Sequence, residues 1–421
     1  MSDPADRPGQ DGPGQPRLLV RDLTQLVTPR GADAPLRGQA LAQVDVLEDA
    51  FVLCSGRVVE AAGRMRDLGA IDGDVIELDG RGLAAIPGLV DCHTHAAFAG
   101  DRVGEFSLRA AGASYEELHA AGGGILSTVR ATRAASQDDL TAATGEHRAW
   151  MRAHGTTTFE AKSGYGLDLD TEIAQLRAIR AVGGVPTWLG AHAVPPEFAN
   201  ADAYLDFLLA TVLPAAAPLA EAADVFLERG AFDAAQARRY LEACRDAGLA
   251  LRMHGDQFTE SGAIPLAVDL GARSVDHLEA TGSEGIAALA ASGVVGVLLP
   301  ASALFLDRPM PPARALVDAG AAIALATDFN PGSAFCDSLP LVCSLACTQL
   351  GLAPEEALAA CTVNAAHVLG RGDRIGRLAA GLDADLVLLD ATDWRYLAYH
   401  LAGDIVHTVV ERGAVSWKRA A

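Results

Sequence analysis

Residues 83–95, LAAIPGLVDCHTH, are the most telling segment of the chain, because an apolar run typical of a buried β-strand ends in two histidines. Side chains alternate across a strand, so His93 and His95 lie on one face while Cys92 and Thr94 lie on the other. Two imidazoles on one face at the carboxyl end of a strand can chelate one divalent metal ion. A polar strand end produces the same His-x-His pattern by chance, so the interpretation depends on the rest of the chain.

Beyond this segment, short apolar runs recur, and each is followed by an Ala- and Leu-rich stretch with charges at helical spacing. Eight such runs in less than 300 residues predict an α/β protein with a (β/α)8 barrel. In that fold the catalytic groups lie at the carboxyl ends of the strands. The predicted strands are Leu83–His95, Thr156–Ala161, Val185–His192, Asp224–Glu228, Leu249–His254, Ser274–Glu279, Val294–Pro300 and Ala321–Asp328.

The two ends of the chain depart from this pattern, because both hold short β-rich runs separated by turns. Such runs lie within residues 17–82 and again within residues 374–421. We expect the two ends to pair into one small β-sandwich, while residues 83–373 form the barrel. Residues 1–16, rich in Gly, Pro and Asp, are expected to be a short disordered tail.

The composition limits the choice of partners and compartment. A formal net charge of -21 argues against nucleic acid and anionic membranes as partners. No apolar run approaches the length of a membrane span, and the first residues lack the basic and apolar parts of a signal peptide. The seven cysteines show no paired spacing and fit a reducing cytoplasm better than a disulfide framework. We therefore expect a soluble cytoplasmic protein.

Several predicted strands end in residues that ligate metals. His93, His95, His254 and Asp328 all fall at strand ends that surround one mouth of the barrel. Three imidazole nitrogens and one carboxylate suit a hydrolytic ion that keeps a position open for water. Asp328 can also accept a proton from that water. The sequence therefore predicts one divalent metal ion per chain, and these ligand types fit Zn2+ and iron (Fe2+ or Fe3+) equally.

Longer motifs around these strand ends resemble a known family. PGLVDCHTH (87–95) is similar to the metal motif of the amidohydrolase superfamily, whose members join a (β/α)8 barrel to a small β-sandwich made from both termini. Within it, essentially all of the chain beyond the first 16 residues resembles the imidazolonepropionases. The segments that carry this narrower resemblance are FSLR (106–109), GGGILSTVRATR (122–133), KSGYG (162–166), LGAHAVPPE (189–197), TDFNPGS (327–333) and TVNAA (362–366).

The resemblance implies a reaction. Imidazolonepropionases hydrolyse the cyclic amide of 4-imidazolone-5-propanoate to N-formimidoyl-L-glutamate in histidine degradation. An activated water would attack the ring carbonyl, which His277 would polarise. Asp328 would take the water proton and deliver it to the leaving ring nitrogen. Gln257, three residues after His254, stands where related nucleobase deaminases carry a titrating Glu, so we expect it to orient the reacting groups.

The resemblance also implies contacts to the flat ring and the anionic propionate tail of the substrate. Arg102, on the loop after the first strand, would pair with the carboxylate, and the alternative is an ion pair with Asp101 or Glu105. Tyr165 would pack on the ring, and His192 would hydrogen-bond to the substrate. Further substrate contacts are expected from Tyr115, Gln257, Asn330, Gly332 and Ser333.

Three other functions are open on the sequence. A nucleobase deaminase is disfavoured because Gln257 cannot titrate. A binuclear cyclic amidase such as a dihydropyrimidinase would carboxylate Lys162, the only lysine in the predicted barrel. The alternative for Lys162 is an ion pair with Glu160 or another loop carboxylate. A non-catalytic scaffold would be expected to have lost metal ligands, and all four are present. A homodimer is common in the resembled family and is the expected assembly.

Overall fold

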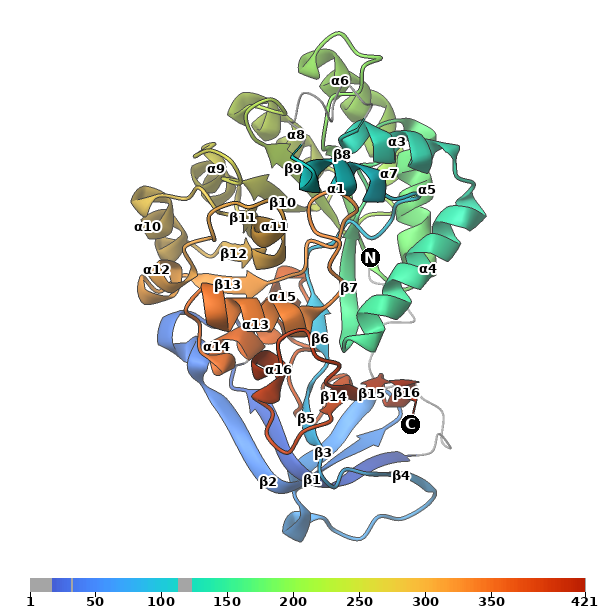
Figure 1. Ribbon diagram of the computed structural model, residues 1–421, viewed down its shortest axis with the longest axis vertical. Helices are drawn as coiled ribbons and strands as arrows, with labels where there is room; N and C mark the ends of the chain where they lie inside the picture. Colours follow the sequence, from blue (N-terminus) through green and yellow to red (C-terminus); the bar gives the residue numbers. More distant parts are fainter. Residues whose placement is uncertain (1–16, 32, 113–122, 421) are drawn as a thin grey trace. The chain divides into compact units, whose positions relative to one another are not determined.

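The computed structural model describes residues 17–31, 33–112 and 123–420 (Figure 1). These residues fall into two compact units, each assembled from segments far apart in the sequence. The barrel unit comprises residues 91–150 and 159–337, apart from residues 113–122. The terminal unit comprises the described residues of 1–90, 151–158 and 338–421. The predicted tail at residues 1–16 lies outside the described residues.

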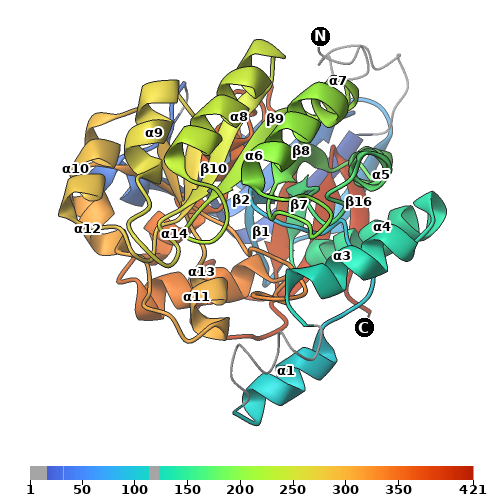
Figure 2. The same ribbon diagram turned by 90° about the horizontal axis from the view of Figure 1, so that it is seen from above.

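One sheet of eight strands confirms the predicted barrel (Figure 2). Its strands follow one another in chain order, and neighbouring strands run parallel. The first and last strands meet where the His95 N–H donates to Phe329 O at 2.9 Å and the Asp328 N–H donates to His93 O at 3.0 Å. The strands are β6 (Leu89–Asp91), β7 (Thr156–Lys162), β8 (Val185–Ala191), β9 (Ala222–Leu227), β10 (Ala250–Gly255), β11 (Ser274–His277), β12 (Val295–Leu298) and β13 (Ala322–Leu325).

Helices follow these strands, as the alternating pattern predicts, and Figure 2 shows them arranged around the sheet. The strands β12 and β13 are buried at every residue, which matches their unbroken apolar sequences. The elements between strands are α1 (Val103–Ala110), α3 (Ile125–Ala134), α4 (Gln137–Ala153), α5 (Leu169–Ala181), α6 (Ala201–Phe207), the π-helical turn η4 (Leu208–Val212), α7 (Leu213–Ala216), α8 (Ala234–Asp246), α9 (Ala263–Leu270), α10 (Ser283–Ala291), α11 (Pro300–Phe305) and α12 (Ala313–Asp318).

A second sheet of eight strands, contributed by both ends of the chain, confirms the predicted small β domain. Its order is β16-β15-β14-β5-β1-β2-β3, and β4 pairs with β1. Apolar side chains such as Leu23, Val52 and Leu386 are fully buried in its core. The strands are β1 (Arg17–Pro29), β2 (Val44–Ser55), β3 (Val58–Arg64), β4 (Val75–Asp79), β5 (Ala84–Pro87), β14 (Leu386–Leu389), β15 (Val406–Glu411) and β16 (Ala414–Lys418).

The prediction of one continuous strand over Leu83–His95 is wrong, because the structure divides this segment at Gly88. Its first half, β5, pairs with β14 in the terminal sheet, with Pro87 opposite Leu386, and only β6 joins the barrel. A Cβ on Gly88 would lie 2.2 Å from Thr157 Oγ1, so no side chain fits there. The Pro-Gly pair therefore marks where the chain leaves one sheet for the other.

The terminal unit also contains helices from residues 338–373, a range that we assigned to the barrel from the sequence. Its helical elements are η2 (Gly38–Ala42), η3 (Met65–Asp67), α13 (Leu339–Gln349), α14 (Pro354–Ala360), α15 (Val363–Val368) and α16 (Tyr396–Tyr399). Over the described part of the chain, no helix combines the length and apolar character that crossing a membrane requires.

Candidate active site

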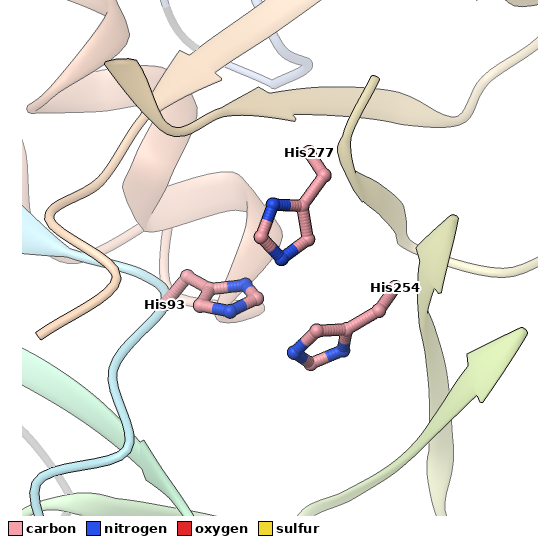
Figure 3. A group of neighbouring side chains, drawn as sticks. All are labelled: His93, His254 and His277. Atoms are coloured by element: carbon pink, nitrogen blue, oxygen red, sulfur yellow. The ribbon is translucent and has the colours of Figure 1, made fainter. Parts of the chain in front are cut away.

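The predicted metal ligands meet at the carboxyl ends of the barrel strands. His93 and His95 follow β6, His254 lies in β10, Asp328 follows β13, and His277 ends β11. All five side chains are buried. Ligand atoms of His93, His254 and His277 lie within 4.8 Å of one another, as do those of His93, His95 and Asp328. Figure 3 shows the rings of His93, His254 and His277 turned toward a common centre.

Short contacts join the four predicted ligands. The Nε2 atoms of His93 and His95 lie 3.4 and 3.5 Å from Asp328 Oδ1. His254 Nε2 lies 3.3 Å from His95 Nε2. His93 Nε2 is buried and has no hydrogen-bond partner among the described residues. Converging imidazole nitrogens and a carboxylate oxygen, with a buried lone pair left unmatched, form a donor set that fits a divalent ion.

Two buried carboxylates orient the ligand histidines from the opposite side of each ring. His93 Nδ1 lies 2.6 Å from Asp276 Oδ2, and His254 Nδ1 lies 2.9 Å from Asp224 Oδ1. A carboxylate accepts the N–H, so Nδ1 carries the hydrogen and the Nε2 lone pair faces the cluster. We did not single out Asp224 or Asp276 from the sequence, although an acidic residue inside an apolar strand was a usable signal.

Two buried cations balance these carboxylates and a third one, Glu160. Lys162 Nζ lies 2.8 Å from Glu160 Oε1, 2.9 Å from Asp224 Oδ2 and 4.0 Å from Asp276 Oδ2. Arg252 contacts Glu160 at 3.0 Å and Asp276 at 3.2 Å. The ion pair of Lys162 with Glu160, the alternative to a carboxylated lysine, is therefore confirmed. Loss of either cation would remove one positive charge from this buried group of carboxylates, and breaking a buried ion pair typically costs about 3–5 kcal/mol.

Burial governs the protonation of the cluster. It lowers the pKa values of His93 and His95 well below the usual histidine value, and Lys162 and the neighbouring histidines oppose their protonation further. Neutral imidazole is the form that ligates metals, so both rings suit that role. Burial raises the pKa of Asp328, while the surrounding histidines oppose the rise.

His277 is held by Glu279, which we missed from the sequence. His277 Nδ1 lies 3.4 Å from Glu279 Oε1, and both side chains are buried. Burial alone would lower the pKa of His277, but the Glu279 carboxylate, followed by Asp328, raises it above the usual value. His277 also has a φ of 87°, a conformation that persists only where the surroundings impose it and that clusters at functional sites. The spacing of His277 and Glu279, two positions apart in one predicted strand, could have indicated from the sequence that their side chains interact.

Arg102, which we predicted to bind the substrate carboxylate, lies against the loop after β13. The Arg102 Nε–H donates to Glu105 Oε2 at 3.0 Å, so the ion pair considered as the alternative is present. The guanidinium also packs on Gly332, where an added Cβ would lie 1.9 Å from Arg102 Nη1. Arg102 thus lies against the loop that carries Asn330, Gly332 and Ser333, as the predicted carboxylate pocket requires.

Asn330 shapes this loop from within. Its Oδ1 accepts the backbone N–H groups of Gly332 and Ser333 at 2.8 and 2.7 Å. Its Nδ2 donates to Asp328 O at 2.6 Å and to Ser333 Oγ at 2.8 Å. Both ends of the amide are engaged in the loop, so Asn330 couples Asp328 to the turn at Gly332. A direct contact between Asn330 and substrate stays a prediction.

Tyr165 and His192 lie against the ligand His95. The His192 ring stacks on the His95 ring with centroids 5.2 Å apart, and the Tyr165 ring lies 5.9 Å from His95 and 5.5 Å from His192. Burial, with a further contribution from His254, lowers the pKa of His192 to about 3, so this ring is neutral. The structure therefore places Tyr165 and His192, the two residues predicted to contact the substrate ring, next to the cluster of predicted metal ligands.

Two predicted residues remain. Gln257 is buried and follows the end of β10 by two residues, after Asp256, whose backbone has a φ of 53°. Its position places it on the same strand end as His254. Tyr115 lies outside the described residues.

A cluster of residues that could hold a metal ion lies at the mouth of the eight-stranded barrel. The amidohydrolase family matches residues 84–415, which defines the class of the protein as a metal-dependent hydrolase. Solved structures share the fold. An adenosine deaminase from Xanthomonas campestris with bound zinc gives a TM-score of 0.70 at 20% identity, covering 94% of this chain and 92% of that one. A Xaa-Pro dipeptidase gives 0.68 at 14% identity, covering 96% and 100%.

Relatives of higher identity narrow the assignment. The imidazolonepropionase of Rubrobacter xylanophilus is 60% identical over 408 residues, which cover 94% of this chain and 98% of the relative. The imidazolonepropionase of Chloroflexus aggregans is 47% identical over 417 residues, which cover 94% and 98%. The chain therefore belongs to the imidazolonepropionases, within the amidohydrolase family.

Proposed function

We propose that the protein hydrolyses the cyclic amide of 4-imidazolone-5-propanoate to N-formimidoyl-L-glutamate, a step of histidine degradation. The observation that carries this proposal is the contact between Arg102 and Gly332, because the same loop begins with the predicted ligand Asp328. An anion-binding group and a hydrolytic cluster thus share one end of the barrel. The substrate has the matching features, a propionate tail and a ring amide. The names of the relatives support the same reaction.

His93, His95 and Asp328 would hold one divalent metal ion per chain together with His254, whose Nε2 lies 3.3 Å from His95 Nε2. Zinc or iron suits these ligands. When bound, such an ion supplies Lewis acidity and lowers the pKa of water toward neutrality. The buried, unpartnered Nε2 of His93 supports this assignment. So do the carboxylates that keep the Nε2 atoms free of hydrogen.

Substrate binding would use the residues on the other side of the cluster. The Arg102 guanidinium pairs with the propionate, and the Gly332–Ser333 turn closes on the same group. Tyr165 packs on the flat ring, and His192 hydrogen-bonds to it. Because Glu105 already shares the guanidinium, the substrate carboxylate either joins this ion pair or displaces Glu105 from it.

The chemical steps would use His277 and Asp328. His277 donates through Nε2 to the ring carbonyl oxygen and stabilises the negative charge that develops there. Asp328 accepts a proton from the attacking water and delivers it to the ring nitrogen as the C–N bond breaks. Gln257 can donate and accept hydrogen bonds but cannot exchange a proton, so its role is orientation.

The rival functions have less support. A nucleobase deaminase of the kind considered above needs a titrating group where Gln257 stands. A binuclear amidase needs a carboxylated lysine, whereas Lys162 lies as an ammonium between Glu160 and Asp224. A non-catalytic scaffold does not require buried histidines whose Nε2 lone pairs all face one cluster. We further propose a cytoplasmic homodimer without nucleic-acid or membrane partners, and sedimentation of the purified protein tests the dimer.

The decisive experiment adds metal-replete protein to freshly prepared imidazolone propanoate and follows the loss of ring absorbance. Formation of N-formimidoyl-L-glutamate, with about one metal ion per chain by elemental analysis, is the expected result. Turnover of a nucleobase or a cyclic ureide, with none of the imidazolone, would contradict the proposal. Two ions per chain would instead support the binuclear alternative.

A further inference from the structure

The loop that follows β7 is wrapped around a single buried carboxylate, that of Glu172 in α5. Glu172 Oε1 accepts the backbone N–H groups of Gly164, Gly166 and Leu167 at 3.1, 3.0 and 2.9 Å. Glu172 is fully buried. A carboxylate that accepts three amides of one loop fixes the path of that loop. We name residues 163–167 the β7 loop.

Close packing leaves this loop little freedom to adopt another path. Gly164 has a φ of 98°, and a Cβ there would lie 2.7 Å from Leu189 O. At Gly166 an added Cβ would lie 2.6 Å from Glu172 N. Leu167 also has a positive φ, 54°, which a leucine rarely adopts without support from its surroundings. The hydrogen bonds to Glu172 supply that support.

The β7 loop in turn orients His192. The Gly164 carbonyl oxygen lies 3.0 Å from His192 Nδ1. A carbonyl oxygen only accepts, so Nδ1 carries the hydrogen and Nε2 of the neutral ring is an acceptor. A substrate that hydrogen-bonds to this nitrogen must therefore offer an N–H or O–H group.

The same loop carries Tyr165, whose backbone N–H donates to Gln175 Oε1 at 3.3 Å. The Gln175 amide also donates to Ala97 O, on the loop after β6. Glu172 and Gln175 both belong to α5, so this helix fixes the loop through two side chains. The Tyr165 ring is thereby held against His95.

We propose that Glu172 is a positioning residue for substrate binding, which acts through the β7 loop on Tyr165 and His192. This inference rests on the proposed function, because it gives His192 Nε2 the task of accepting a ring N–H of the imidazolone. Glu172 itself touches no reacting atom. Its loss should affect the binding of the ring more than the chemical step.

Two variants of Glu172 separate these roles. Glu172→Gln keeps an acceptor oxygen at the same reach, whereas Glu172→Asp withdraws the carboxylate by one methylene. In Glu172→Asp we expect KM to rise about tenfold with kcat changed less than about threefold, while Glu172→Gln recovers most of the loss. In a His192→Ala background, Glu172→Asp should raise KM much less, because the two residues act through one path.

A matched control is Glu356→Asp. Glu356 is a buried glutamate of α14 in the terminal unit, and its Oε2 accepts the Ala353 N–H at 2.8 Å. This change should lower thermal stability and leave KM unaltered. A rise in KM as large as that of Glu172→Asp would show that any loss of a buried carboxylate has this effect, and it would overturn the inference.

A second measurement does not depend on the substrate. Hydrogen exchange of the β7-loop amides, read by mass spectrometry, should be faster in Glu172→Asp than in the parent and in Glu172→Gln. The side-chain 15N shifts of His192 should lose the pattern of a single Nδ1–H tautomer. Unchanged exchange and tautomer would overturn the inference, whether or not imidazolone propanoate is the substrate. If the parent shows no turnover while these changes occur, only the proposed function fails.

Discussion

The guanidinium of Arg102 lies so close to Gly332 that a Cβ on the glycine would be 1.9 Å from Arg102 Nη1. No rotation of an alanine relieves this clash, because the Cβ position is fixed by the backbone. The loop after β6 can therefore pack its Arg102 against the loop after β13 only because position 332 is a glycine.

Gly332→Ala should displace Arg102 and weaken binding of the substrate carboxylate. We expect KM to rise about tenfold or more, since a hydrogen bond to a charged group contributes about 1.5–3 kcal/mol. Steady-state kinetics measure this. Gly104→Ala is the control, because a Cβ at Gly104 meets nothing within 4 Å. Equal KM values for the two variants would show that Arg102 does not contribute to substrate binding.

Asp276→Asn should weaken metal binding, because Asp276 orients the His93 ring through Nδ1. An asparagine can present its amide N–H to Nδ1 and reverse the tautomer. Loss of such a partner typically lowers metal affinity about 10- to 100-fold. Competition with a chromogenic chelator measures the affinity. Asp206→Asn, at an exposed ion pair with Arg239, should leave it unchanged.

Glu279→Gln should lower kcat, because Glu279 orients His277 and stabilises its positive charge. We expect a loss of about tenfold or more in kcat with little change in KM, as for a group that acts on the developing oxyanion. The double variant with His277→Ala should be no slower than His277→Ala alone. Additive losses would mean that Glu279 acts elsewhere.

Asp385→Asn should stabilise the terminal unit at neutral and alkaline pH. Burial raises the pKa of Asp385 to about 6, against the opposing hydrogen bond from the Arg412 N–H. The native state thus binds this proton more tightly than the unfolded state, whose pKa is near the usual 3.8. The charged carboxylate therefore lowers the free energy of unfolding. This loss is absent below about pH 4, grows between the unfolded-state and native-state pKa values, and reaches roughly 3 kcal/mol above about pH 7.

The asparagine can still accept the Arg412 N–H through Oδ1 and has no charge to bury. Urea unfolding at several pH values should therefore show an advantage of the variant that increases from acid to neutral pH and then stays constant. An advantage that is independent of pH would contradict the assigned pKa shift.

The barrel could be predicted, and so could the meeting of His93, His95, His254 and Asp328 at its mouth, because both depend on local patterns. Period-two alternation puts His93 and His95 on one face, and strand ends place His254 and Asp328 near them without any knowledge of packing. The break at Gly88 could not be predicted in this way, since the apolar run continues through Pro87 and both halves are buried. The pairing of β5 with β14 depends on residues about 300 positions away.

The supporting residues were missed for a different reason. Asp224, Asp276 and Glu279 stand in predicted strands, but their partners are histidines on other strands or across a turn of unusual φ. The role of Glu172 depends on three backbone amides, which leave no mark in the side-chain sequence. Contacts made to the main chain are the part of a site that residue types reveal least.

Burial of Lys162 has a practical consequence for handling the protein. The sequence contains two lysines, and Lys162 is fully enclosed by its carboxylates, whereas Lys418 is exposed in β16 of the terminal sheet. Among lysine side chains, amine-reactive dyes and supports should therefore reach only Lys418, outside the unit that carries the site, in addition to the terminal α-amino group. An immobilised enzyme made in this way should keep its full catalytic rate.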